Sequence, residues 1–221
     1  MSRDQTQRRD KLLAALLPAV PFDGWTRAAL RAAAAQAGIN AAELAELFPR
    51  GARDAVAWFS AWADRKTLAA LASRKHERLR TGTRIALGVR TRLELLRPHR
   101  EAVRRALSLL ALPGNLALGA KLLYDTVDTL WFAAGDRSTD FNFYTKRALL
   151  AGVYAATSLY WLDDRSENAA ATGEFLDRRL REVLAIPRLR AAAARFADPL
   201  GILRRVRAAA PFARMMRKAA A

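Results

Sequence analysis

The pattern of apolar and polar positions predicts a protein built of α-helices. Two stretches, residues 106–120 and 148–162, carry no charged side chain. A helix that is apolar on every side is normally buried, so we expect both stretches to form inner helices of one domain. The polar segment 135–147 lies between them and begins with Gly135, which predicts a turn after a helix that ends at 134.

The first fifty residues predict short helices separated by proline and glycine, at 8–17, 25–37 and 41–47. Gly38 fits a C-terminal cap and Asn40 an N-terminal cap. This layout is typical of a helix-turn-helix module, and equally of a plain three-helix packing unit. The third helix, AAELAEL, lacks the Arg, Lys, Asn and Gln side chains that most often bind purine edges. We therefore expect no specific DNA binding from it.

Further helices are predicted at 52–79, 84–96, from about 99, at 116–134, and at 172–185. Another runs to Leu162 from an N-cap at Ser138, Thr139 or Asp140, and Asn115 is expected to cap the helix 116–134. Pro187 is expected to end the globular part. The predicted organisation is an N-terminal unit at 1–50, a larger helical ligand-binding domain at 51–186, and a C-terminal tail at 187–221.

Apolar side chains recur at helical spacing on the two central helices. The helix 116–134 carries one such set, which includes Leu116, Leu123, Val127 and Trp131. The next helix carries two stripes, one with small residues beside aromatic rings and one with larger side chains. The first includes Phe141, Tyr144, Ala148 and Gly152, and the second includes Phe143, Arg147 and Tyr154. The small residues predict either a close helix contact or open space.

The net charge of the chain predicts an anionic partner. The chain has 38 Lys and Arg against 21 Asp and Glu, a formal net charge of +17. Such an excess favours nucleic acid or an anionic membrane surface. In the tail, apolar residues at helical spacing alternate with arginines on other faces, namely Leu200, Leu203, Arg204, Arg205, Val206 and Arg207. A basic amphipathic helix often lies in a membrane interface, and a tail docked on the protein or disordered is the alternative.

The sequence offers little catalytic chemistry. It has no cysteine, two histidines (His76 and His99), no glycine-rich phosphate loop and no nucleophile elbow. The nearby carboxylates of Asp125 and Asp128 more often serve as caps and ion-pair partners than as metal ligands. We therefore expect no enzyme, no metal site and no cofactor. The start of the chain fits a first helix better than a signal peptide, which predicts a cytoplasmic protein that rests peripherally on the inner membrane.

The most specific motif is GDRSTDFNFYTKR at 135–147, with YDTVDTLWFAA before it and FLDRRL after it. Together with PFDGWTRAALRAAA near the start, it closely resembles the ninth member of the coenzyme Q (ubiquinone) biosynthesis set. The resemblance covers roughly residues 22–184. It implies an all-α, TetR-like helical bundle, in which an N-terminal helix-turn-helix-like unit precedes a larger ligand-binding helical domain. Because TetR-like proteins pair through their last helices, it also implies a homodimer.

The resemblance implies a non-enzymatic accessory protein that binds an isoprenoid lipid or ubiquinone precursor and presents it to the demethoxyubiquinone hydroxylase at the membrane. The family's contact surface corresponds to Phe143 and Tyr144, to which we add Arg147. Mitochondrial members commonly have Trp at the position of Phe143. The phenylalanine of this chain keeps an apolar ring but lacks the indole donor. The lipid is expected to contact Leu116, Leu123, Val127, Trp131, Phe141, Tyr144, Ala148, Gly152 and Tyr154. Candidate polar partners for its headgroup are Tyr124, Thr126, Asn142 and Tyr154.

A ligand-responsive TetR-type transcription regulator is the alternative function. The net charge of +17 favours it. Glu43 and Glu46 in the third predicted helix oppose it, because their carboxylates would be repelled by the phosphates of DNA.

Overall fold

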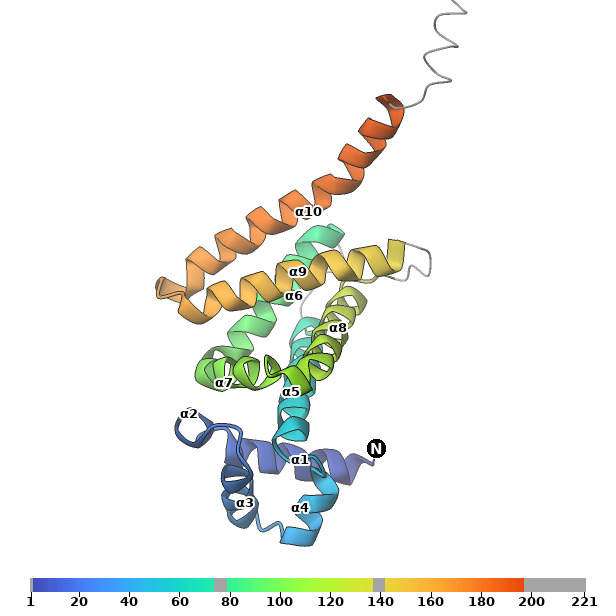
Figure 1. Cartoon of the computed structure of the whole chain (residues 1–221). Helices are drawn as coiled ribbons and strands as arrows, with labels where there is room; N and C mark the ends of the chain where they lie inside the picture. Colours follow the sequence, from blue (N-terminus) through green and yellow to red (C-terminus); the bar gives the residue numbers. More distant parts are fainter. Residues whose placement is uncertain (1, 74–78, 137–141, 197–221) are drawn as a thin grey trace, which may run out of the picture. The chain divides into compact units, whose positions relative to one another are not determined.

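The computed structural model describes residues 2–73, 79–136 and 142–196, of which 142–143 and 184–196 are described by their backbone alone. In these residues it contains α-helices and short 3-10 turns and no strand (Figure 1). The helices are α1 (Arg3–Leu16), α2 (Val20–Asp23), α3 (Arg27–Gln36), α4 (Ala41–Leu47), α5 (Ala52–Ala72), α6 (Thr81–Leu96), α7 (Arg100–Leu110), α8 (Leu116–Ala133), α9 (Asn142–Asp163) and α10 (Ala170–Phe196). The prediction of an all-α protein is confirmed.

The chain divides into two compact units, Met1–Leu180 and Arg181–Ala221. All contacts described below lie within the first unit. Helix α10 begins in the first unit and its backbone continues to Phe196 in the second. The predicted helix end near residue 185 is therefore wrong. A proline inside a helix removes one backbone donor and crowds the preceding turn. Strong helix formers flank Pro187, with LREVLA before it and the alanine-rich LRAAAARF after it, and they favour a helix that continues through the proline.

The first fifty residues contain the three predicted helices and one more. Helix α1 begins at Arg3 and not at 8, because Ser2 caps it, and the short helix α2 was not predicted. Leu12, Leu13 and Leu16 of α1 are buried and pack against α3 and α5. Gly38 adopts φ +68°, and the side chain of Asn40 accepts a hydrogen bond of 2.9 Å from the backbone N–H of Glu43. Both predicted caps are thus confirmed, and they fix the turn between α3 and α4.

The larger part of the first unit is built on α5, which packs along α6 and α8, while α8 also packs against α9. Gly88 lets α6 approach α8, because a Cβ there would lie 3.0 Å from the Cδ2 atom of Leu130. Helix α6 begins at Thr81 and not at 84. Asn115 does not cap α8 through its side chain, since its amide nitrogen donates to the carbonyl oxygen of Leu109 instead, at 2.8 Å.

The first uncharged stretch, 106–120, was expected to be buried in inner helices, and this prediction is wrong for much of it. It spans the end of α7, a turn and the start of α8, and it exposes Leu112 by 55% and Leu116 by 58%. At this turn the chain bends by 101° between the helical segments Thr81–Leu110 and Pro113–Ala133. Because the stretch is divided between two helix ends, no single continuous helix is available to bury it. The second stretch, 148–162, lies within α9 and buries one face, including Leu150, Val153 and Trp161.

Within the described residues, no helix is by itself both long enough and apolar enough to cross a bilayer. One bent pair of helical segments, Thr81–Leu110 with Pro113–Ala133, would be long and apolar enough by length and composition alone.

Candidate functional site

A cavity of about 370 Å³ lies among α5, α6, α7, α8 and α9. Its volume falls within the range of small-molecule pockets. The walls are mostly aliphatic or aromatic and are formed by Val56, Phe59, Ala63, Leu96, Val103, Ala106, Leu107, Leu110, Ala111, Gly119, Leu122, Leu123, Ala155 and Leu159. An apolar ligand could replace water here over most of its surface.

Two exposed residues of the cavity wall indicate that it opens between α7 and α9. They are Ala111 at the end of α7 and Leu159 on α9. The side chain of Leu159 is 59% exposed. The turn that carries exposed Leu112 directly follows Ala111, so the surface beside the opening is also apolar. An apolar chain could therefore enter from this side.

One wall of the cavity is polar and is centred on Arg92 of α6. The Arg92 side chain is buried, and its Nε atom lies 2.8 Å from the Oδ1 atom of Asp64 on α5. Its Nη1 atom donates to the hydroxyl oxygen of Tyr154 on α9, at 2.6 Å. Its Nη2 atom lies 3.2 Å from the hydroxyl oxygens of both Ser60 and Thr126. We call these five residues the Arg92 cluster.

The Arg92 cluster keeps its central charge. Burial by itself would lower the pKa of Arg92, but Tyr154 and Asp64 oppose this effect and the pKa is raised overall. Thr126 also donates to the Oδ2 atom of Asp64, at 3.2 Å, so both carboxylate oxygens of Asp64 have partners. A buried charge is stable only when it is paired and hydrogen-bonded in this way. The cluster thus presents fixed polar groups inside an otherwise apolar cavity.

The structure places only Leu123 and Tyr154, of the nine predicted lipid-binding residues, in the wall of this cavity. Val127 and Trp131 are buried elsewhere in the core. Four others are exposed, namely Leu116, Tyr144, Ala148 and Gly152. Phe141 lies outside the described residues. The small-residue stripe of α9 therefore faces outward over Tyr144, Ala148 and Gly152, whereas the stripe that contains Tyr154 faces the interior.

Two of the polar residues predicted to bind the headgroup, Thr126 and Tyr154, belong to the Arg92 cluster. Tyr124 is 43% exposed and does not line the cavity, and the side chain of Asn142 lies outside the described residues. The sequence patterns did not predict four other polar residues at or behind this wall, namely Arg92, Asp64, Ser60 and Ser158. A signal existed for Arg92, because Val89, Leu93 and Leu96 place it on the apolar side of α6, but the surrounding basic run suggested a solvated face.

The predicted partner-binding residues occupy different positions at the start of α9. Tyr144 is 70% exposed, and the side chain of Phe143 lies outside the described residues. Arg147 is buried, with Nε 2.7 Å from the Oδ1 atom of Asp128 and Nη1 3.7 Å from the Oδ2 atom of Asp136. Arg147 therefore joins α9 to α8 and to the segment that follows α8, and it is not itself on the surface. The predicted membrane-binding residues, Leu200 to Arg207, lie outside the described residues.

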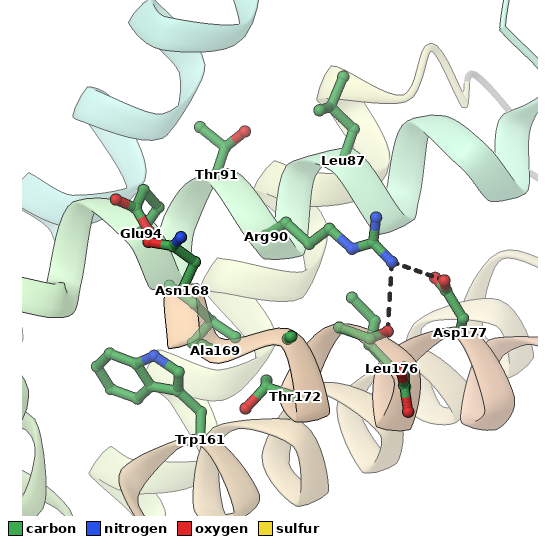
Figure 2. A pocket seen from close by; sticks show the side chains of 14 residues that line it. Leu87, Arg90, Thr91, Glu94, Trp161, Asn168, Ala169, Thr172, Leu176 and Asp177 are labelled. Carbon is green, nitrogen blue, oxygen red and sulfur yellow. Dashed lines mark hydrogen bonds and ion pairs between the residues drawn. The ribbon is translucent and has the colours of Figure 1, made fainter. Parts of the chain in front are cut away.

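A second cleft, of about 520 Å³, lies between α6 and the first turns of α10. Figure 2 shows Arg90 reaching from α6 toward α10, where its Nη2 atom lies 2.6 Å from the Oδ2 atom of Asp177. The same nitrogen donates to the carbonyl oxygen of Gly173, at 3.3 Å. Glu94, on the same helix, is paired with Arg97. Arg90, Glu94 and Asp177 line this cleft and are already paired, and Glu174 adds a further charge. The cleft therefore suits an apolar ligand less well than the cavity beside Arg92.

A model of the COQ9 family matches residues 116–187. The chain is 35% identical over 190 residues to "Ubiquinone biosynthesis protein COQ9, mitochondrial" of Rattus norvegicus, covering 83% of this chain and 60% of that protein. It is 34% identical to the Homo sapiens protein of the same name, with 83% and 59% covered, and 33% identical to that of Drosophila melanogaster, with 80% and 55% covered. The chain thus spans 60% or less of these three relatives.

Among solved structures, the chain is similar to a TetR transcriptional regulator from Nitrosomonas europaea ATCC 19718, with a TM-score of 0.62. The match covers 80% of this chain and 97% of that structure at 22% sequence identity. At this identity the likeness establishes the fold alone. The predicted TetR-like helical bundle is confirmed.

Proposed function

This chain belongs to the COQ9 family, and we propose that it serves ubiquinone biosynthesis as a non-enzymatic protein that binds an isoprenoid lipid. The names of its relatives support the pathway. The observation that carries the proposal is the apolar cavity of about 370 Å³ that opens beside Leu159. In a TetR-like body, such a cavity between helices is suited to an elongated apolar ligand.

The energetics favour an isoprenoid chain over a polar metabolite. Removing apolar surface from water contributes about 25 cal/mol per Å², and ordering of the ligand offsets part of that gain. The walls offer this apolar contact on all five surrounding helices, from Val56 on α5 to Leu159 on α9. A small polar metabolite would find partners at the Arg92 cluster and at Ser158 and would leave the rest of the cavity poorly filled.

The experiment is lipid extraction and mass spectrometry of full-length protein made in a quinone-producing host. The wild-type protein should carry a prenylated lipid, and Leu123→Trp should lose most of it, because the larger ring fills the cavity. Leu116→Trp is the matched control, since Leu116 lies on the same helix but is exposed outside the cavity. Circular dichroism would verify folding, and Ala155→Phe would fill the cavity from α9 if Leu123→Trp misfolds. Consistently empty wild-type protein would contradict the proposal.

We further propose that the bound lipid is presented to the demethoxyubiquinone hydroxylase at an anionic membrane surface, by a homodimer. Exposed Tyr144 at the start of α9 supports a contact with the hydroxylase, in line with the family resemblance. The membrane contact is proposed for the basic tail, whose residues 188–221 contain nine Lys and Arg and one Asp. The protein would then act peripherally on the inner membrane without a catalytic residue or cofactor of its own.

A DNA-binding regulator is the second candidate, favoured by the TetR-like fold and the net charge of +17. The chemistry of α4 opposes it, because Glu43 points toward Arg8 of α1, with their side-chain atoms 2.6 Å apart, and α4 carries no basic side chain. A gel-shift titration across salt concentrations would distinguish the two. Specific duplex binding at physiological salt would favour the regulator, whereas weak, salt-sensitive association would be general electrostatic attraction.

A further inference from the structure

We propose that the Arg92 cluster, together with Ser158 of α9, is a subsite for the oxygen atoms of an uncharged ring, such as a quinone or a phenol, at the head of the bound lipid. This inference rests on the proposed lipid-binding function and adds the chemistry and the orientation of the headgroup. It concerns the cavity wall formed by Arg92 of α6 together with Tyr154 and Ser158 of α9.

The first observation is that two hydrogen-bond donors of the Arg92 cluster remain available to a ligand. A guanidinium group has five N–H bonds, of which two belong to Nη1. In the described structure, Nη1 of Arg92 donates to one acceptor, the hydroxyl oxygen of Tyr154. Because that oxygen accepts from Arg92, the hydroxyl proton of Tyr154 remains to be donated elsewhere. Both donors belong to side chains that line the cavity.

Ser158 supplies a second, independent observation. Its side chain lines the cavity and is only 7% exposed, and its hydroxyl oxygen is buried without a hydrogen-bond partner in the described structure. Buried hydroxyl groups nearly always have a partner, because leaving one unpaired is costly. Ser158 lies four residues after Tyr154, so the two side chains share one face of α9. A ligand oxygen between them would satisfy a donor that the protein leaves open.

Charge balance identifies the class of headgroup. Asp64 neutralises Arg92 through the 2.8 Å ion pair, so the subsite holds no net positive charge to compensate a ligand anion. A diphosphate or carboxylate would have to leave water for this apolar cavity without an unpaired cation to receive it. A carbonyl, hydroxyl or methoxy oxygen on a ring is cheaper to desolvate and can still accept from Tyr154, Ser158 and Arg92. The subsite therefore favours an uncharged oxygenated ring over an anionic headgroup.

The positions along α9 orient the lipid. Tyr154 lies at the polar wall, Ala155 lines the cavity beside it, and Leu159 lies at the opening. A ring bound at the Arg92 cluster would direct its isoprenoid tail past Ala155 toward Leu159. The headgroup would therefore enter first, and its ring would be shielded from water until the lipid is transferred.

The test measures two ligands with the same short isoprenoid tail, one ending in a benzoquinone ring and one a plain hydrocarbon. Wild-type full-length protein should bind the quinone about tenfold more tightly, as expected for one or two added hydrogen bonds. Ser158→Ala and Tyr154→Phe should each weaken quinone binding about fivefold and leave hydrocarbon binding unchanged. Tyr160→Phe is the matched control, because Tyr160 stacks on Phe175 and does not line the cavity.

Ser158→Ala is the decisive variant, since it leaves the ion pair of Arg92 with Asp64 intact even if Tyr154→Phe lowers stability. Infrared spectra of carbonyl-labelled quinone should show a band shifted to lower wavenumber in the wild-type complex and partly restored in Ser158→Ala. Equal binding of both ligands with an unshifted carbonyl band would overturn the subsite and leave lipid binding intact. Tighter binding of a prenyl diphosphate of the same tail would overturn the uncharged class. Failure to bind any of these ligands would instead overturn the proposed function.

Discussion

Arg92 of α6 and Asp64 of α5 form a buried ion pair, with the Nε and Oδ1 atoms 2.8 Å apart. Both residues are at most 8% exposed. The pair joins two neighbouring long helices at the polar wall of an apolar cavity and positions the side chains of Tyr154 and Thr126 around it. It therefore links the stability of the helical body to the chemistry of the cavity.

Replacing Asp64 with Ala should destabilise the protein by about 3–5 kcal/mol, because Arg92 would be left as an uncompensated buried charge. Chemical denaturation at neutral pH would measure the free energy of unfolding. The control is Asp177→Ala, which breaks the pair with Arg90 at the surface, where both side chains are 49% exposed. That change should cost no more than about 1 kcal/mol. Similar losses in the two variants would contradict the role assigned to burial.

Asp164 should make stability depend on acid pH. Burial by itself would raise the pKa of this carboxyl, but hydrogen bonds from the hydroxyl and N–H groups of Ser166 and Thr172 outweigh it and hold the pKa well below its usual range. The native state thus favours the carboxylate. Its contribution to stability should be fully present above the unfolded-state pKa of about 3.9 and lost as pH falls below that value.

Urea unfolding of the wild-type protein and Asp164→Asn at several pH values would test this. The variant should be less stable at pH 7, and the difference should shrink as the pH is lowered through about 4. Asp163→Asn is the neighbouring control, because Asp163 is largely exposed and pairs at the surface with Arg104. A difference between wild type and Asp164→Asn that stays constant down to the lowest pH would contradict the assignment.

Tyr144→Ala should weaken binding of the demethoxyubiquinone hydroxylase about tenfold or more, since exposed aromatic side chains often dominate protein interfaces. Surface plasmon resonance with the purified hydroxylase would measure the dissociation constant. Tyr124→Ala removes an exposed tyrosine from α8 and should leave binding unchanged. Arg147→Ala should lower the melting temperature instead, because it removes a buried guanidinium group that pairs with Asp128 and Asp136. Unchanged binding by Tyr144→Ala would exclude this tyrosine from the interface.

Deletion of the chain after Pro187 should abolish sedimentation with anionic liposomes. The deleted segment contains nine Lys and Arg and one Asp, and each basic residue near an anionic surface contributes roughly 1 kcal/mol. Leu200→Asp with Leu203→Asp is a milder change that keeps the basic residues and should weaken binding through lost apolar contact. Neutral liposomes should bind the wild-type protein poorly. Undiminished binding of the truncated protein would exclude the tail as the anchor.

The sequence by itself determined the helices and many of their ends. The cap at Asn40, the turns at Gly38 and Gly135, and the helix 41–47 were all predictable, because capping and backbone conformation depend on residues a few positions apart. The motif at 135–147 indicated the COQ9 family for the same reason, as it is a continuous run of residues. The end of α10 was missed, because favourable helix propensity on both sides outweighed the cost of Pro187.

Only the tertiary structure decided which side chains face the cavity. Periodicity identified two stripes on α9, but the packing of α9 against α8 made the Tyr154 stripe the inner one and left Tyr144, Ala148 and Gly152 exposed. Likewise, Arg92 belongs to a basic run that suggested a solvated face, and its role depends on Asp64, 28 residues earlier in the chain. Local spacing defines the faces of a helix, whereas burial and pairing depend on neighbours that are distant in the chain.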